Sequence, residues 1–380
     1  MATGSYWHEL FARLQAADGA RDLLSPGLPL PAPPLPASIL TLAAALAAIY
    51  GLGARARRGL YTRGWLPVKR LPAPVVSVGN LTVGGTGKTP TVACLARLFQ
   101  DRGLRVAILS RGYRGQGAGV LKVSDGERLY QKPPAVGDEA YWLARSLPGV
   151  AVYTGACRYR AGLAAWEEAQ PDLFLLDDGF QHFQLHRDLD IVLLDADSPF
   201  GNGRLLPRGP LREPVSTLAA AQVLILTRYQ AERHQEVLAQ LRAAFPEKTV
   251  LTAAIAPAAV RLYPGGLEAP LQDLKGQSLL AFAGLARPQF FARTLRELGV
   301  NLKGFQAFPD HHLYRAGDLV MLIREARTRG AAALITTTKD WARLGERWEA
   351  DLPLWVLEVQ ARLGEALPPH LLSPLLGERR

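Results

Sequence analysis

The sequence predicts an α/β fold in which a mostly parallel β-sheet is covered by helices. Several runs of leucine and β-branched residues after residue 73 are continuously apolar, without alternating polar side chains. Strands that are buried on both faces have this composition. The segments that separate the runs, such as residues 90–103, are long enough for the helices that connect parallel strands. The expected strands are 74–78, 105–110, 172–178, 190–195, 222–227, 249–255, 278–284, 332–338 and 354–359.

The composition limits the class of protein. The 380 residues suffice for two domains or one large domain with additions, and 48% apolar residues exclude global disorder. Cys94 and Cys157 lie too far apart for a zinc motif or a disulfide framework, which fits a reducing compartment. The net charge of +10 favours binding to an anionic membrane or to a phosphorylated substrate. Nucleic-acid binding is less favoured, because the sequence lacks the interleaved basic and aromatic residues typical of such modules.

The N-terminal region combines a proline-rich arm, residues 25–36, with an apolar helix expected at 37–53. Cations without an acidic neighbour follow the helix: Arg55, Arg57, Arg58, Arg63, Lys69 and Arg70. We predict that the helix lies on an anionic membrane surface, where each cation contributes about 1 kcal/mol. A buried core helix and a membrane span remain alternatives. A cleaved signal peptide does not fit, because the cations follow the apolar stretch.

The stretch SVGNLTVGGTGKTP, residues 77–90, follows the first expected strand and opens a helix near Thr89. Its glycines allow the backbone amides to wrap an anion, and the helix N-terminus attracts phosphate. Lys88 would contact the β- and γ-phosphates, and Thr89 would bind Mg²⁺. An incidental glycine turn is the alternative, because a threonine replaces the first glycine of the phosphate-loop pattern. The predicted nucleotide-binding residues are Thr82, Val83, Gly84, Gly85, Thr86, Gly87, Lys88 and Thr89.

A second motif, DLFLLDDGFQH at residues 172–182, ends an apolar strand with Asp177 and Asp178. In a phosphate-loop protein, a carboxylate at this place binds the Mg²⁺ of the nucleotide. The sequence TTKD at 337–340 lacks the spacer of a guanine-reading motif, so ATP is the expected nucleotide. The sequence HRDLD at 186–190 lacks the asparagine of a protein-kinase catalytic loop.

Two further groups of residues could serve proton transfer. Asp138 and Glu139 follow a glycine at an expected helix start, and His311 lies in the expected loop FPDHHLY, residues 308–314. An aspartate supported by a histidine can accept the proton of an attacking hydroxyl. Taken singly, each also fits a helix cap or a polar surface loop. His182 and His186 have the spacing of a zinc pair, but the acidic partner is missing, so a structural or substrate role is favoured.

Seven motifs in order resemble those of the tetraacyldisaccharide 4'-kinases, the lipid A 4'-kinase family. They are SVGNLTVGGTGKTP, LSRGYRG (109–115), GDEA (137–140), DDGFQHFQLHRDLDIVLLD (177–195), LLPRGPLREP (205–214), AFAGLARPQFF (281–291) and FPDHHLY. The resemblance implies a peripheral, monotopic enzyme on the cytoplasmic face of the bacterial inner membrane. It implies MgATP-dependent phosphorylation of the 4'-hydroxyl of a tetraacyldisaccharide 1-phosphate lipid, with no protein partner.

The resemblance also assigns residues. Lys88 and Thr89 would bind nucleotide and Mg²⁺, Asp138 would be the catalytic base, and His311 its partner. The implied metal ligands are Thr89, Asp177 and Asp178, and the implied substrate or phosphate residues are Glu139, Arg111, Tyr113, Arg158, Gln181, His182 and Arg212. The family's Gly-Asp-Glu-Pro is Gly-Asp-Glu-Ala here, and residues 1–36 are not explained by the family.

The expected organisation has four parts. They are the N-terminal arm (1–36), the membrane-associated helix with its basic flank (37–70), a phosphate-loop domain (71–230) and a smaller C-terminal α/β domain (231–380) that contributes His311. Two other functions remain as alternatives. One is a membrane-associated ATPase or switch that acts on a protein partner, and the other is a soluble phosphate-loop ligase or kinase for a small metabolite.

Overall fold

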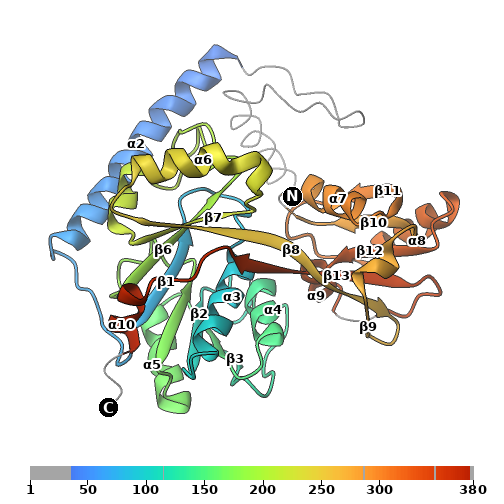
Figure 1. The fold of residues 1–380 in the computed structure, drawn as a ribbon, viewed down its shortest axis with the longest axis horizontal. Coiled ribbons are helices and arrows are strands. Elements are labelled where there is room, and N and C mark those ends of the chain that lie inside the picture. The colour runs from blue at the N-terminus through green and yellow to red at the C-terminus, as the bar shows by residue number, and fades with distance from the viewer. Residues whose placement is uncertain (1–35, 114, 286, 346–347, 377–380) are drawn as a thin grey trace.

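The computed structural model describes residues 36–113, 115–285, 287–345 and 348–376. The proline-rich arm therefore lies outside the described residues, apart from Pro36. The described chain folds into two lobes that share one 13-stranded sheet (Figure 1). The strand order is β11-β10-β12-β13-β8-β7-β6-β1-β5-β2-β4-β3, with β9 paired to β8. This mixed α/β architecture confirms the predicted fold class.

The first lobe has a parallel sheet whose one antiparallel edge strand is β3. Its strands are β1 (Val75–Asn80), β2 (Val106–Ser110), β3 (Leu121–Ser124), β4 (Ala151–Thr154), β5 (Leu173–Asp177), β6 (Leu189–Asp195) and β7 (Val223–Thr227). Its helices are α3 (Lys88–Gln100), α4 (Asp138–Ser146), α5 (Arg158–Ala169), α6 (Ala231–Ala244) and the 3-10 helix η1 (Val215–Ala220).

The core of the first lobe explains why its strands are continuously apolar. Every residue of β1 is buried, with Val76 and Val78 packing in the core beneath α3 and α4. The adjacent Val75 points the other way and packs with Ala161 and Ala165 of α5 on the opposite face. Successive side chains of a strand point to opposite faces, so a sheet covered by helices on both sides needs apolar residues at every position.

The second lobe repeats this three-layer arrangement on a smaller scale. Its strands are β9 (Leu267–Ala269), β10 (Ser278–Ala283), β11 (Asn301–Ala307) and β12 (Ala333–Thr337). Its helices are α7 (Pro288–Glu297), α8 (Ala316–Thr328), α9 (Thr338–Arg343) and the 3-10 helix η2 (Leu271–Leu274). Leu295 of α7 packs in one core, and Leu322 of α8 and Trp341 of α9 pack in the other.

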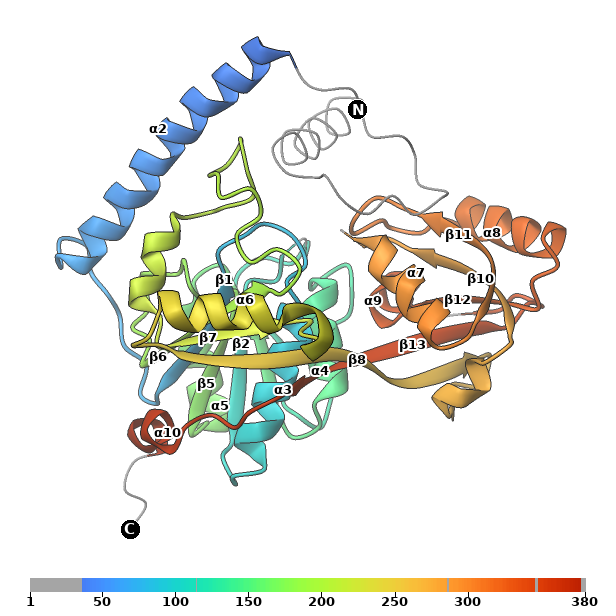
Figure 2. The same ribbon diagram turned by 45° about the horizontal axis from the view of Figure 1, so that its top comes forward.

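Two long antiparallel strands, β8 (Thr249–Tyr263) and β13 (Leu354–Leu363), connect the lobes (Figure 2). The start of β8 pairs with β7 of the first lobe, and the start of β13 pairs with β12 of the second. After β13 the chain returns to the first lobe, where α10 (Pro369–Leu376) adds Leu372 and Leu375 to the core beneath α3. The first lobe thus contains α6, the beginning of β8 and α10, all of which follow residue 230.

The nine expected strands are present, with ends shifted by a few residues. β8 is the largest difference, because it continues to Tyr263 along β13. The strands β3, β4, β9 and β11 were not predicted. They are short, or they carry polar residues at partly exposed sheet positions, so no continuous apolar run marks them.

Helix α2 (Ala37–Thr62) projects from the first lobe (Figures 1 and 2). It continues beyond the expected end at residue 53, through the basic segment. Ala43, Ala47 and Gly51 form its buried stripe, and a Cβ on Gly51 would lie 2.6 Å from Leu205 Cδ1. Only 17% of its most apolar window is buried, which argues against the core-helix alternative. By length and composition α2 could also cross a membrane.

Candidate active site

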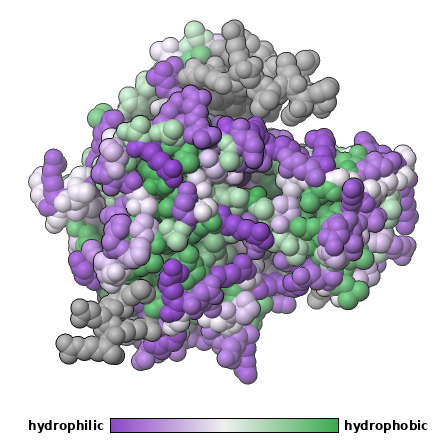
Figure 3. Space-filling view, in the orientation of Figure 1, coloured by the Kyte–Doolittle hydropathy of each residue, from purple (hydrophilic) through white to green (hydrophobic). Residues whose placement is uncertain are grey.

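A cavity of about 1490 Å³ lies between the lobes, at the carboxyl ends of β1, β2 and β5. In the space-filling view the lobes meet along a hollow (Figure 3). Open α/β sheets bind their ligands at this edge, where loops from several strands converge. Apart from Thr82 and Asp138, every site residue expected from the sequence lines this cavity.

The glycine-rich loop connects β1 to α3 along the cavity wall. Gly84 and Gly87 have positive φ angles of 107° and 75°, a conformation that residues with a Cβ rarely adopt. The Thr227 hydroxyl donates to the carbonyl of Thr86 at 2.8 Å and fixes the loop to β7. Backbone amides of such a loop, together with the N-terminus of α3, form a binding site for phosphate groups.

Lys88 and Asp178 lie at the centre of the cavity. The Lys88 ammonium is 3.1 Å from Asn80 Oδ1 and 3.6 Å from Asp178 Oδ1. Arg212 donates to both carboxylate oxygens of Asp178, at 3.0 and 2.9 Å. Burial alone would raise the pKa of Asp178, but the charges of Lys88 and Arg212 outweigh it and lower the pKa. The three residues thus form a compensated charge cluster that a phosphate could enter.

Asp177 has an oxygen that fits a metal ion. Its Oδ2 accepts a hydrogen bond from Ser110 at 3.0 Å, whereas its buried Oδ1 has no partner among the described residues. Burial, followed by the negative charges of Glu139 and Asp178, raises the pKa of Asp177 to about 6. A bound cation would compensate this carboxylate. Among the described residues, no three His, Cys, Asp or Glu side chains form a group suited to a metal ion.

The second lobe brings His311 to Asp138. Helix α4 begins at Asp138 as predicted, and His311 lies in the predicted loop, with a φ of 61°. Their side chains meet at 3.2 Å between His311 Nδ1 and Asp138 Oδ2. Burial opposes ionisation of Asp138, but His311 and the cations Arg343 and Lys339 lower its pKa well below the usual range. His311 lines the cavity, with the ring of Tyr113 edge-on at 5.9 Å.

The remaining predicted residues surround this centre. Arg158 and His182 each have a buried nitrogen without a hydrogen-bond partner among the described residues. Burial, with the nearby arginines, lowers the pKa of His182 to about 4, so this ring is neutral at pH 7. Gln181 donates to the backbone of Asn80 at 2.9 Å. The other lining residues of this group are Arg111, Tyr113, Glu139 and Arg212.

Three residues that were considered from the sequence, Thr82, Asp138 and His186, do not line the cavity. Thr82 is buried beside the loop, where its carbonyl accepts a hydrogen bond from Asn80 Nδ2 at 2.6 Å. Asp138 is buried behind His311 and contacts it directly. His186, the second member of the histidine pair, lies 3.4 Å from Asp188, and Asp188 accepts from the backbone of Val75. The sequence HRDLD therefore supports β1 and is not a catalytic loop.

Sequence analysis missed several polar residues of the site. They are Asn80, Ser110, Arg228, Arg287, Lys339 and Arg343. Lys339 belongs to the TTKD segment that was considered only as a guanine-reading motif. Arg287 comes from the second lobe and donates to Asp195 of β6 at 2.6 Å, and Arg228 contacts the same carboxylate. Apart from the contact between Asn80 and Lys88, these interactions join residues at least 33 positions apart, so spacing alone could not reveal them.

Comparison with known proteins gives one consistent result. The family model described as "Tetraacyldisaccharide-1-P 4'-kinase" matches residues 39–376. A tetraacyldisaccharide 4'-kinase of Geobacter metallireducens is 46% identical over 81% of this chain and 89% of its own length. The tetraacyldisaccharide 4'-kinase of Syntrophus aciditrophicus is 42% identical over 83% of this chain and 87% of its own length. A crystal structure of LpxK from Aquifex aeolicus in complex with ATP has 34% identity and a TM-score of 0.68, covering 86% of this chain and 95% of that one.

The position of Lys88 generates a first prediction. Lys88→Ala should weaken ATP binding by roughly 10- to 100-fold, because a charge-assisted contact to phosphate is lost. Isothermal titration calorimetry with ATP and Mg²⁺ measures this change. Lys122→Ala, which removes a surface pair with Glu168 and a contact with the ring of Tyr130 but does not alter the cavity lining, is the matched control. Equal ATP affinity in the wild type and Lys88→Ala would contradict the assignment of the loop.

Proposed function

The chain belongs to the tetraacyldisaccharide-1-P 4'-kinase family, and from this we propose that it transfers the γ-phosphate of ATP to the 4'-hydroxyl of tetraacyldisaccharide 1-phosphate in lipid A biosynthesis. The observation that supports the proposal best is that one cavity joins the phosphate loop to the Asp138–His311 pair. A membrane-associated ATPase or switch that acts on a protein partner is not favoured, because the matching family and its relatives are 4'-kinases.

The first lobe would hold the nucleotide. The amides of residues 83–89 would surround the phosphates, with Lys88 at the β- and γ-phosphates. Thr89, Asp177 and Asp178 would hold Mg²⁺, which when bound supplies neutralising charge for the transferring group. Asp177 supports this role through its buried oxygen without a partner. Arg158 and Arg212 would add positive charge to the transition state, where fixed cations in a dry site are most effective.

Asp138 would receive the proton of the 4'-hydroxyl. Its carboxylate does not line the cavity but contacts His311, which does, through Oδ2. A carboxylate with a lowered pKa is a weak base, but phosphoryl transfer through a loose transition state depends mainly on positioning. Asp138 would therefore chiefly orient the nucleophile, with His311 completing the pair. Glu139, Arg111, Tyr113, Gln181 and His182 would contact the polar groups of the substrates.

We propose that the enzyme acts as a peripheral protein on the cytoplasmic face of the bacterial inner membrane. The larger side chains of α2 are exposed: Leu42 at 61%, Ile49 at 67% and Leu52 at 65%. Tyr50 and Arg57 of the same helix line the cavity. The helix that would lie in an anionic membrane surface thus forms part of the wall of the site. An acylated sugar could move from the membrane to the cavity along this helix, without a protein partner.

A product assay tests the proposed activity. The purified chain is incubated with Mg²⁺, ATP labelled at the γ-phosphate, and the tetraacyldisaccharide 1-phosphate in detergent micelles. We expect label in a bisphosphorylated lipid. Release of labelled inorganic phosphate without labelled lipid would contradict the proposal and favour the ATPase alternative.

The role of Asp138 gives a second prediction. Asp138→Ala should lower kcat by roughly 10²- to 10⁴-fold while the Kd for ATP changes by less than about threefold, because the base acts in the transition state. Initial rates and ATP titration measure the two effects. Asp351→Ala, which removes an exposed carboxylate of the second lobe, should leave both unchanged. Unchanged turnover in Asp138→Ala would remove Asp138 from the mechanism.

A third prediction concerns α2. The triple variant Leu42→Ser/Ile49→Ser/Leu52→Ser should bind vesicles of phosphatidylethanolamine and phosphatidylglycerol at least about tenfold more weakly, because each buried aliphatic side chain contributes about 1.5–3 kcal/mol. Vesicle co-sedimentation measures binding. Val320→Ser, which alters an exposed apolar residue of α8, is the control. Equal sedimentation of the triple variant and the wild type would exclude α2 as the membrane contact.

A further inference from the structure

The TTKD segment opens α9, a short helix of the second lobe that packs against α4 of the first. Lys339 and Arg343 are four residues apart, so they project from the same side of α9. On α4, the adjacent acidic residues Asp138 and Glu139 form the first turn. The two cations of α9 meet these two acids across the boundary between the lobes.

Arg343 contacts both members of the Asp138–His311 pair. Its Nε donates to Asp138 Oδ2 at 2.7 Å, and its Nη2 lies 3.3 Å from His311 Nδ1. The Arg343 side chain is only 3% exposed, so these contacts are made away from bulk water. A planar guanidinium with several fixed donors can hold two partners at a defined separation, which an ammonium group cannot.

The same guanidinium is tied to the backbone that carries His311. Gly284, which follows β10, accepts a hydrogen bond from Arg343 Nη1 at 2.6 Å and one from the His311 amide at 3.2 Å. The Gly284 amide donates to Asp340 Oδ1 at 3.0 Å, and Asp340 also accepts from Arg343 at 3.1 Å. A Cβ on Gly284 would lie 3.1 Å from the carbonyl of Pro309. Any larger residue at this position would have to displace these segments by a few tenths of an ångström.

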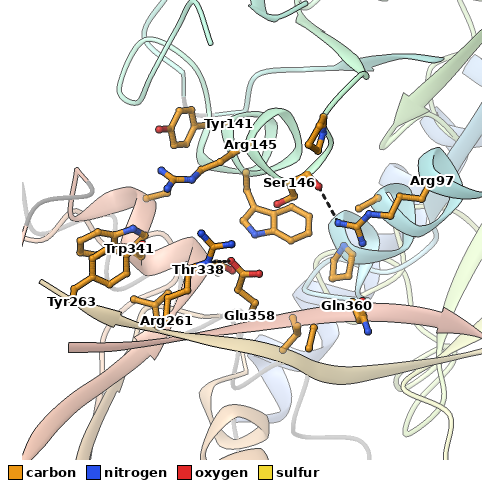
Figure 4. A pocket seen from close by; sticks show the side chains of 18 residues that line it. Arg97, Tyr141, Arg145, Ser146, Arg261, Tyr263, Thr338, Trp341, Glu358 and Gln360 are labelled. Carbon is orange, nitrogen blue, oxygen red and sulfur yellow. Dashed lines mark hydrogen bonds and ion pairs between the residues drawn. The ribbon is translucent and has the colours of Figure 1, made fainter. Parts of the chain in front are cut away.

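A smaller cavity, of about 300 Å³, lies beside the site and is lined by residues of α3, α4, α9, β8 and β13 (Figure 4). Trp142 of α4 and Thr338 of α9 line both cavities. On the second-lobe side, the ring centres of Trp341 and of Tyr263 in β8 lie 4.0 Å apart. The contact between α4 and α9 therefore borders two cavities. The Lys339–Glu139 ion pair, at 2.5 Å, and the Arg343–Asp138 pair cross this contact.

We propose that Arg343 and Lys339 are positioning residues that assemble the Asp138–His311 pair from its two lobes. Arg343 sets the distance between the carboxylate and the imidazole, and Lys339 fixes the first turn of α4 through Glu139. Neither residue need touch the substrates for this role. The inference rests on the proposed function, because it assigns a task to residues next to the proposed base.

The charges around Asp138 give the proposal a pH signature. The charged and titratable groups that face it are Glu139 on its own helix, Asp310 and His311 on the loop, and Lys339, Asp340 and Arg343 on or beside α9. Loss of the Arg343 charge raises the pKa of Asp138, since that charge now lowers it. The carboxylate then takes up a proton at a higher pH, and activity is lost earlier as the pH falls.

The test compares Arg343→Gln with Arg343→Lys in steady-state assays from pH 3 to 9. We expect Arg343→Gln to lower kcat by about 10- to 100-fold, with KM for ATP changed by less than about threefold. In the wild type the acidic limb set by Asp138 lies well below the usual range of an aspartate, and in Arg343→Gln it should move up toward the ordinary aspartate pKa of about 4. Arg343→Lys keeps the charge and should keep the wild-type limb, with a smaller loss of kcat. Lys339→Gln should lower kcat by only about two- to tenfold, because Lys339 acts on the pair through Glu139.

Arg329→Gln, which alters an exposed arginine of the second lobe, is the control. The proposal is overturned if Arg343→Gln keeps the wild-type kcat. It is also overturned if kcat falls while the acidic limb of the pH profile stays at its wild-type position. If Arg343→Gln does not fold, as judged by Tm, then Arg343→Lys and Lys339→Gln decide, and wild-type kcat in both overturns the proposal. A failure of this kind leaves lipid phosphorylation by the wild type intact, so it is distinguishable from a failure of the proposed function.

Discussion

The site depends on a geometric constraint, which is that β8 and β13 run through both lobes as one antiparallel pair. The carboxyl ends of β1 and β5 present the phosphate loop and the two aspartates at one edge of the first lobe. The paired long strands hold the second lobe over this edge, so that the loop after β11 can deliver His311 to α4. Neither lobe alone contains the phosphate loop and the complete Asp138–His311 pair.

Electrostatic compensation follows from this arrangement. Asp138 forms an ion pair with Arg343, and Glu139 forms one with Lys339. Asp178 forms ion pairs with both Lys88 and Arg212. Buried charges are tolerated only when they are paired and hydrogen-bonded. Asp177 is the exception at the centre, because one of its oxygens is left without a partner among the described residues and its pKa is raised. The protein thus keeps an incompletely compensated carboxylate, which a cation such as the proposed Mg²⁺ would balance.

Much of the fold was predictable from the sequence, because strands buried on both faces, such as β6 and β7, contain continuous apolar runs, with polar side chains only toward their ends. The phosphate loop was predictable because its glycines and its Lys-Thr pair are adjacent in the chain. The contacts of Arg343 were not, since residues 138 and 343 meet only when β8 and β13 align the lobes. Short edge strands such as β3 were missed for a related reason. Their pairing, and not their composition, makes them strands.

In the proposed complex, the phosphate tail of ATP lies between the glycine-rich loop and the Asp138–His311 pair. A crystal structure of the chain with Mg²⁺ and a non-hydrolysable ATP analogue tests this placement most directly. We expect the γ-phosphate within hydrogen-bond distance of Lys88, with Mg²⁺ bound by Thr89 and at least one of the two aspartates, and with the phosphate facing Asp138. An analogue bound outside the cavity, or a γ-phosphate directed away from Asp138, would contradict it.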